Sequence, residues 1–221
     1  MGTSSNFGNM FSAAGASTFL TFLPMLPSQI LLNNLLYDSS QLAIPTDSVD
    51  PDQLQRPSHW DMRMIRRFML FFGPISSAFD FITFCMLLWP LHATMVEFRT
   101  GWFVESLATQ TLVIFAIRTR RTPFFRSSPS RALLFAAWTV VLCGAWLPAS
   151  PLSGVLGFTP LPWTFYGVLV VLVISYLAIV DIAKAWFFAH LAAPHPPRPP
   201  AATRRLHRRA SRFGVSDSLH G

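Results

Sequence analysis

The sequence predicts an all-α membrane protein, a six-transmembrane-helix bundle with both termini cytoplasmic. Three observations support this fold class. Of the 221 residues, 52% are hydrophobic and only 12% are charged, about half the charged share of a typical soluble domain. Several apolar windows reach the roughly 20 residues needed to cross a bilayer core. The basic residues gather between alternate windows rather than evenly along the chain.

Six apolar segments are long enough to predict membrane spans. We expect helices over about 7–27, 28–45, 68–91, 101–117, 132–148 and 163–187. The first two are joined by a tight turn marked by Pro24 and Pro27, and the others are rich in large apolar side chains. Tryptophans stand near the expected outer edges of the last four spans, where interfacial aromatic residues are enriched. They are Trp89, Trp102, Trp146 and Trp163.

The net charge of +7 orients the bundle. The basic residues that fall on one side of a six-span topology are Arg56, Arg63, Arg66, Arg67, Arg118, Arg120, Arg121, Arg126, Arg131, Lys184 and the six arginines from Arg198 to Arg212. Arg99 alone falls on the other side. This is the positive-inside pattern, which places both termini in the cytoplasm. The positive charge therefore requires no nucleic-acid partner, and the expected partner is the lipid bilayer.

The chain divides into a membrane domain over 1–188 and a tail over 189–221. The tail contains the run PHPPRPPAATRRLHRRASR, whose Pro/Arg-rich composition predicts a disordered, basic cytoplasmic segment.

The first two spans carry polar side chains that lipid contact does not explain. Asn34 and Asp38 are four residues apart and share one helical face, and Asn6 and Asn9 are three apart and do the same. An Asp near the middle of a membrane helix costs about 2.5–3.5 kcal/mol. Two antiparallel helices joined at Pro24–Pro27 would point these four oxygen-bearing side chains at each other.

Oxygen ligands with a single carboxylate suit a hard cation. Mg²⁺ keeps several waters and takes only one or two carboxylates from a protein, and no His or Cys stands near these residues to favour a softer metal. The alternative is interhelical hydrogen bonding, which we favour for Asn6 or Asn33 taken alone. For Asn34 with Asp38 we favour an ion path.

Further polar residues within the spans are candidates for the same path. Asp80 and Glu105 are intramembrane acids, which are functional candidates by default. We expect Asp80 to face the bundle, where a role in the path and a structural role are equally open. Glu105 stands near the outer end of its span, where hydration would account for it as well as function would. Tyr37 directly precedes Asp38 and is added to the candidate path. Asp181 and Lys184 are three residues apart, and we expect an ordinary ion pair between them.

The order of these segments resembles a known family. SSNFGN followed by FLPMLPSQILLNNLLYDSSQLAIP is similar to the fifth and sixth transmembrane helices of P-type cation ATPases, and most of all to the bacterial magnesium-importing type. RRFMLFFGPISSAFDFITF, GWFVESLATQTLVIFAIRTRRTPF and the LP–LPWTFY loop follow in the same order. The resemblance covers residues 3–188 and implies a multi-pass protein of the bacterial inner membrane.

The resemblance also implies roles for residues. Asn6, Asn9, Asn34 and Asp38 would occupy the ion-binding positions, with Mg²⁺ as the transported ion and a further ligand from a fourth helix absent here. The family phosphorylates the Asp of a DKTGT motif, but the chain's single lysine, Lys184, follows Ala183. We therefore expect no ATP site in these 221 residues and no catalysis by the chain alone, with the catalytic domains upstream of Met1.

Three functions follow as hypotheses. The first is a membrane-domain fragment of a magnesium-importing pump, active with the missing half in trans or in a longer gene product. The second is a non-catalytic partner or remnant that packs against an intact pump. The third and weakest is a passive cation channel.

Overall fold

The computed structural model describes residues 2–47, 62–119 and 129–190, and every regular element in these ranges is helical. In chain order the elements are α1 (Gly2–Ala16), α2 (Pro27–Gln41), η1 (Ile44–Thr46), α4 (Met62–Leu88), α5 (Met95–Ile117), α6 (Arg131–Trp146), η3 (Leu147–Ala149), α7 (Ser153–Leu156) and α8 (Trp163–His190). The all-α prediction is thus confirmed for the described part. The expected tail over 189–221 lies outside it, apart from residues 189 and 190, which end α8.

Four described helices are long and apolar enough to cross a membrane, namely α4, α5, α6 continued by η3, and α8. The first two expected spans form shorter helices. α1 and α2 have 15 residues each, and at 1.5 Å per residue each is about 22 Å long, less than the roughly 30 Å of a bilayer core.

The prediction of one continuous helix over 7–27 is wrong, because α1 ends at Ala16 and residues 17–26 form turns. The hydroxyls of Ser17 and Thr18 donate to the carbonyl oxygens of Ala14 and Gly15, each at 2.7 Å. Side chains that bond the backbone in this way favour helix ends over helix interiors. The proline at residue 24 then prevents regular helical hydrogen bonding further along.

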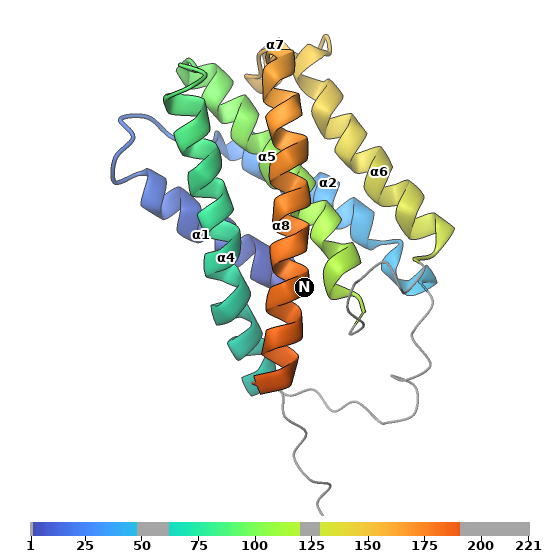
Figure 1. Ribbon diagram of the computed structural model, residues 1–221. Helices are drawn as coiled ribbons and strands as arrows, with labels where there is room; N and C mark the ends of the chain where they lie inside the picture. Colours follow the sequence, from blue (N-terminus) through green and yellow to red (C-terminus); the bar gives the residue numbers. More distant parts are fainter. Residues whose placement is uncertain (1, 48–61, 120–128, 191–221) are drawn as a thin grey trace, which may run out of the picture.

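Helix α5 is the central element of the bundle. In Figure 1 it runs behind α8, with α4 on one side and α6 on the other. Its side chains are buried almost continuously from Phe98 to Ala116. The surrounding helices α6 and α8 instead expose large apolar side chains such as Phe135, Val171 and Ile182. Exposed apolar surface of this kind fits contact with lipid.

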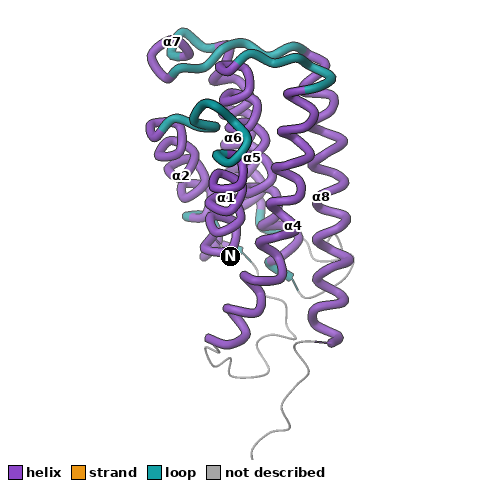
Figure 2. The backbone as a smooth tube through the Cα atoms, turned by 90° about the vertical axis from the view of Figure 1, so that its left-hand side faces the viewer, coloured by secondary structure: helices purple, strands orange, loops and turns teal. Residues whose placement is uncertain are grey.

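Helix α1 packs closely along α4, and both views place the two side by side (Figures 1 and 2). A Cβ added at Gly8 would lie 3.1 Å from the Cβ of Ser76, and one added at Gly73 would lie 2.9 Å from a ring carbon of Phe7. The Ser77 hydroxyl donates to the Gly8 carbonyl oxygen at 3.0 Å. Small residues at a helix contact permit such close backbone approach in membranes.

The loops before α5 and around α7 lie at one end of the bundle, away from the N-terminus (Figure 2). Trp89, Trp146 and Trp163 are all exposed, as expected for interfacial tryptophans. The expectation for Trp102 is wrong, because this side chain is only 2% exposed. It lies inside the bundle because α5 is surrounded by other helices along nearly its whole length.

Candidate functional site

A small pocket lies between α1, α2 and α5, and two of the predicted ion-site residues line it. Asn9 comes from α1 and Asn34 from α2, and the pocket has a volume of about 290 Å³. Asn33 and Trp102 line it as well. The side chain of Asn6 lies outside the described part of the structure. Within the described residues, the structure therefore brings together Asn9 and Asn34 of the predicted set.

The fourth member of that set, Asp38, is exposed and does not line the pocket. Helix α2 buries the face that carries Gln29, Asn33, Tyr37 and Ser40. Asn34 and Asp38 share the next face around the helix, as their spacing predicted. The expected convergence of all four side chains is thus not seen, because α2 turns its Tyr37 face, rather than its Asp38 face, toward α5.

The surroundings of Asp38 are apolar. Three exposed leucines lie on and directly after α2. They are Leu31, Leu35 and Leu42, with exposed fractions of 72%, 62% and 80%. A carboxylate on such a surface is expensive to place against lipid. This face of α2 is therefore suited to contact with protein that offers polar partners.

A polar cluster adjoins the pocket, formed by Asn9, Asn33, Ser106 and Gln110, and we call it the Ser106 cluster. Three side-chain amide nitrogens lie within hydrogen-bond distance of the Ser106 Oγ. They belong to Asn9 at 2.6 Å, Gln110 at 3.0 Å and Asn33 at 3.1 Å. Ser106 itself is fully buried. Ser106 and Gln110 were not among the residues predicted from the sequence. Their only signal was a pair of polar residues four apart in an apolar span, which places them on one helical face.

The two intramembrane acids lie beside each other in the interior. Asp80 is 2% exposed and Glu105 is 1% exposed, and their carboxyl groups are neighbours. The Ser12 hydroxyl donates to Asp80 Oδ2 at 2.5 Å, and the Trp102 indole donates to Asp80 Oδ1 at 3.1 Å. Asp80 therefore faces the bundle, as expected, and joins α1, α4 and α5.

Glu105 differs from Asp80 in its hydrogen bonding. Within the described ranges, its carboxyl group lies close to the Asp80 carboxyl and the Thr109 hydroxyl, but neither of its oxygens forms a hydrogen bond of good geometry with them. The alternative that Glu105 is simply hydrated at the outer end of its helix does not hold, because the side chain is buried. Burying two neighbouring acids is costly, which keeps Glu105 a candidate for function. Tyr37 is 1% exposed and belongs to the core.

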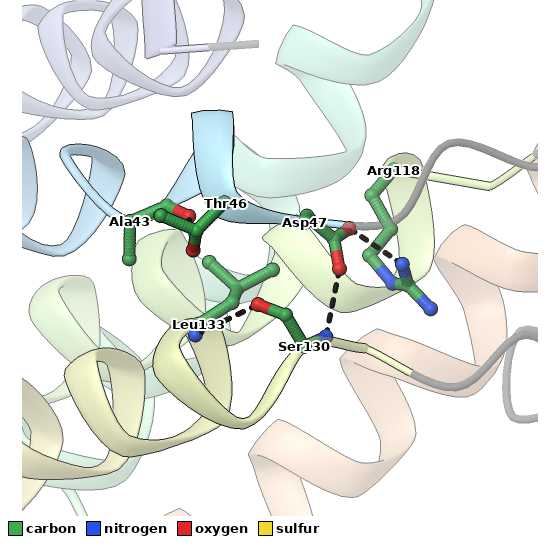
Figure 3. A network of polar contacts seen from close by, with 6 residues as sticks. All are labelled: Ala43, Thr46, Asp47, Arg118, Ser130 and Leu133. Carbon is green, nitrogen blue, oxygen red and sulfur yellow. Dashed lines mark hydrogen bonds and ion pairs between the residues drawn. The ribbon is translucent and has the colours of Figure 1, made fainter.

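A second polar network ties the end of α2 to α5 and α6 (Figure 3). Asp47, which follows η1, forms an ion pair with Arg118 at 2.5 Å. Its other carboxylate oxygen accepts the backbone N–H of Ser130 at 2.7 Å. Ser130 in turn caps α6, because its hydroxyl accepts the N–H of Leu133 at 3.1 Å. Asp47 was not among the residues predicted from the sequence, because its role depends on contacts far along the chain.

The expected pair of Asp181 and Lys184 is confirmed, with 2.7 Å between the charged atoms. The lysine is more deeply placed than an ordinary surface pair requires, since it is fully buried. Its ammonium group also donates to the Ala116 carbonyl oxygen at 2.8 Å. Lys184 therefore links α8 to the end of α5.

The described residues contain no group of three or more His, Cys, Asp and Glu side chains that could hold a metal ion. A cation at the pocket would therefore depend on oxygens of the side-chain amides that line it, those of Asn9, Asn33 and Asn34. Such oxygens are ligands that hard cations accept, and they are neutral. A cation at this pocket would meet neutral side chains rather than several carboxylates.

Comparison with known proteins gives one family and several relatives. The family described as "Cation transporting ATPase, C-terminus" matches residues 22–186. A protein named "Magnesium-transporting ATPase, P-type 1" from Escherichia coli (strain K12) is 47% identical over 191 residues, which are 85% of this chain and 21% of that protein. Proteins of the same name from Salmonella typhimurium strains 14028s and LT2 are 46% and 41% identical over the same shares. The chain thus spans about a fifth of the length of these relatives.

Proposed function

The chain belongs to the family of the cation transporting ATPase C-terminus, and from this premise we propose that it is the membrane domain of a magnesium-transporting P-type ATPase. The observation that carries the proposal is the pocket between α1, α2 and α5, which the side-chain amides of Asn9 and Asn34 line. The relatives that match 85% of the chain are named for magnesium transport. Mg²⁺ is accordingly the proposed transported ion.

Within this function, the chain supplies half of a cation path through the membrane. Asn9, Asn34 and Asp38 are the proposed ligands, together with Asn6. Mg²⁺ retains several of its waters when bound, so amide oxygens can accept hydrogen bonds from those waters as well as bind the metal. Asp80 and Glu105 are the proposed acidic groups further along the path, with Tyr37 beside it.

The exposed position of Asp38 supports a partner on the open face of α2. The carboxylate stands among exposed leucines, and a membrane-spanning helix with polar groups would remove it from lipid. We propose that this partner is the remaining part of the pump, within one longer polypeptide or as a separate chain. ATP hydrolysis and the phosphorylated aspartate are then properties of that part.

We propose further that α1 and α2 complete a six-helix membrane domain with both ends in the cytoplasm of a bacterial cell, in its inner membrane. Arg118 and Lys184 lie near the ends of α5 and α8, and exposed Trp89 and Trp163 lie at the opposite ends of α4 and α8. Basic residues inside and aromatic residues at the interface are the usual arrangement. The short α1 and α2 would cross with help from the adjoining turns.

Growth of a bacterial strain that lacks its own magnesium transporters tests the proposal. The strain receives this chain, the portion of the E. coli relative that precedes the matching segment, or both, either as two chains or fused. We expect growth at low magnesium only when both are present. Growth with this chain alone would instead establish a passive cation channel. If neither arrangement supports growth while the chain inserts into the membrane, the proposal fails and a non-catalytic partner or remnant remains.

A further inference from the structure

We propose that Ser106 is a positioning residue that fixes the orientation of the Asn9 side-chain amide, so that its oxygen faces the pocket between α1, α2 and α5. The inference rests on the proposed cation path and goes beyond it, because Ser106 is not itself one of the proposed ligands. It follows from the geometry of the Ser106 cluster.

An asparagine side chain has two different ends. Its oxygen accepts hydrogen bonds and binds cations, whereas its NH₂ group only donates. The two groups are similar in size, so the hydrogen-bond network decides which way the amide is turned. A cation site that contains Asn9 therefore needs a group that holds the NH₂ end and leaves the oxygen free.

Ser106 supplies that group for Asn9. The distance of 2.6 Å between Asn9 Nδ2 and Ser106 Oγ is the shortest of the three contacts to this hydroxyl. Among the described residues, the buried oxygens without a partner include those of Asn33 and Gln110, but not that of Asn9. Among the described residues, no hydrogen bond is directed at the Asn9 oxygen and this atom is not one of the fully buried ones without a partner. Because Asn9 lines the pocket, we infer that its oxygen is the end that faces this space.

The other two amides have a different place in the Ser106 cluster. A hydroxyl has two lone pairs and one hydrogen, so three amide nitrogens cannot all donate to Ser106 Oγ at once. With Asn9 donating, only one of Asn33 and Gln110 can do so as well. The oxygen of the remaining amide is then the acceptor for the Ser106 O–H. The cluster thus holds Asn9 in one orientation, while the two buried amides of Asn33 and Gln110 can trade the roles of donor to Ser106 and acceptor from it.

Binding of Mn²⁺ to the full 221-residue chain in lipid nanodiscs tests this role, with free Mn²⁺ measured by electron paramagnetic resonance. Mn²⁺ accepts the same oxygen ligands as Mg²⁺. Ser106→Ala removes the acceptor for the Asn9 NH₂ group and should raise the Mn²⁺ Kd about fivefold, the factor for one net hydrogen bond. Ser106→Thr retains the hydroxyl and should stay within about twofold of the unmodified chain.

A second background separates positioning from mere packing. Asn9→Asp has an oxygen at both ends, so its orientation no longer matters. In this background, Ser106→Ala should change the Kd less than about twofold. Ser175→Ala is the matched control, because that exposed serine on α8 bonds only the carbonyl oxygen of its own helix. It should leave the Kd unchanged, and circular dichroism reports whether each variant keeps its helices.

Each outcome decides the inference. An unchanged Kd in Ser106→Ala, or an equal loss in the Asn9→Asp background, would overturn the positioning role while leaving the proposed transport function intact. If Ser106→Ala loses helicity, its Kd is not interpreted. The Kd of Ser106→Thr and the comparison of Asn9→Asp with and without Ser106→Ala then test the positioning role. Absence of Mn²⁺ binding by the unmodified chain would overturn the inference in this chain, and the growth experiment would then judge the transport function separately.

Discussion

Replacement of Asp47 by alanine should destabilise the bundle strongly, although Asp47 lies outside every long helix. The Asp47 and Arg118 side chains are only 12% and 8% exposed. The substitution removes the ion pair and the acceptor for the Ser130 N–H. It also leaves the Arg118 guanidinium shielded from water without this carboxylate.

The magnitude follows from these contacts. Breaking a buried pair by removing one partner costs about 3–5 kcal/mol, and residual exposure places Asp47→Ala near the lower limit, at about 3 kcal/mol. Asp47→Asn loses the charge but keeps an oxygen for the Ser130 N–H, which should restore about 1 kcal/mol. Because the first change already removes the contact that Arg118 makes with Asp47, adding Arg118→Ala to Asp47→Ala should cost less than the two single effects together.

The assay is equilibrium unfolding of the full chain in mixed micelles, followed by circular dichroism as the denaturing detergent is raised. Arg131→Ala, at an exposed arginine that begins α6, is the control and should change the free energy of unfolding by less than about 0.5 kcal/mol. A value for Asp47→Ala as small as that of the control would refute the reasoning. Additive single effects in the double variant would refute the direct pairing.

Two further predictions concern the stability of the bundle and use the same unfolding measurement. Gln29→Glu keeps an oxygen for the Leu26 N–H but loses donation to the carbonyl oxygens of Leu156 and Gly157. It should destabilise the chain by about 2 kcal/mol. No measurable change would show that these two contacts do not hold α2. Lys184→Met removes the ion pair with Asp181 and should destabilise the chain by at least about 2 kcal/mol. Adding Asp181→Asn should recover part of that loss. A further decrease in the free energy of unfolding would contradict the pairing.

The long apolar helices were predictable from sequence because composition and length alone decide them. Helices α4, α5, α6 and α8 each contain a window that is apolar enough to span a membrane. Helix α1 was not predicted correctly, since hydropathy does not register the serine and threonine hydroxyls that end it. Trp102 was misplaced for a related reason. Position near a helix end suggests an interface, but only the surrounding helices determine that this ring is buried against Asp80.

The candidate site was predictable in part. Helical spacing correctly placed Asn34 and Asp38 on a common face, yet spacing cannot say which face of α2 packs on α5. That choice depends on Asn33 and Tyr37, which are buried instead. The role of Ser106 could not be predicted from the sequence, because two of its three contacts come from other helices, α1 and α2. The sequence separation between Asn9 and Ser106 is 97 residues, and no local pattern records such a contact.

Magnesium uptake into proteoliposomes tests the central claim most directly. The vesicles contain the E. coli relative with its matching segment replaced by this chain, together with ATP and a magnesium-sensitive dye. We expect ATP-driven uptake that Asp38→Asn lowers at least about tenfold, since a lost charged ligand weakens a hard-cation site by more than about 1.4 kcal/mol. Ser39→Ala, at the exposed neighbouring residue, should transport normally. Uptake by Asp38→Asn equal to that of Ser39→Ala would contradict the account.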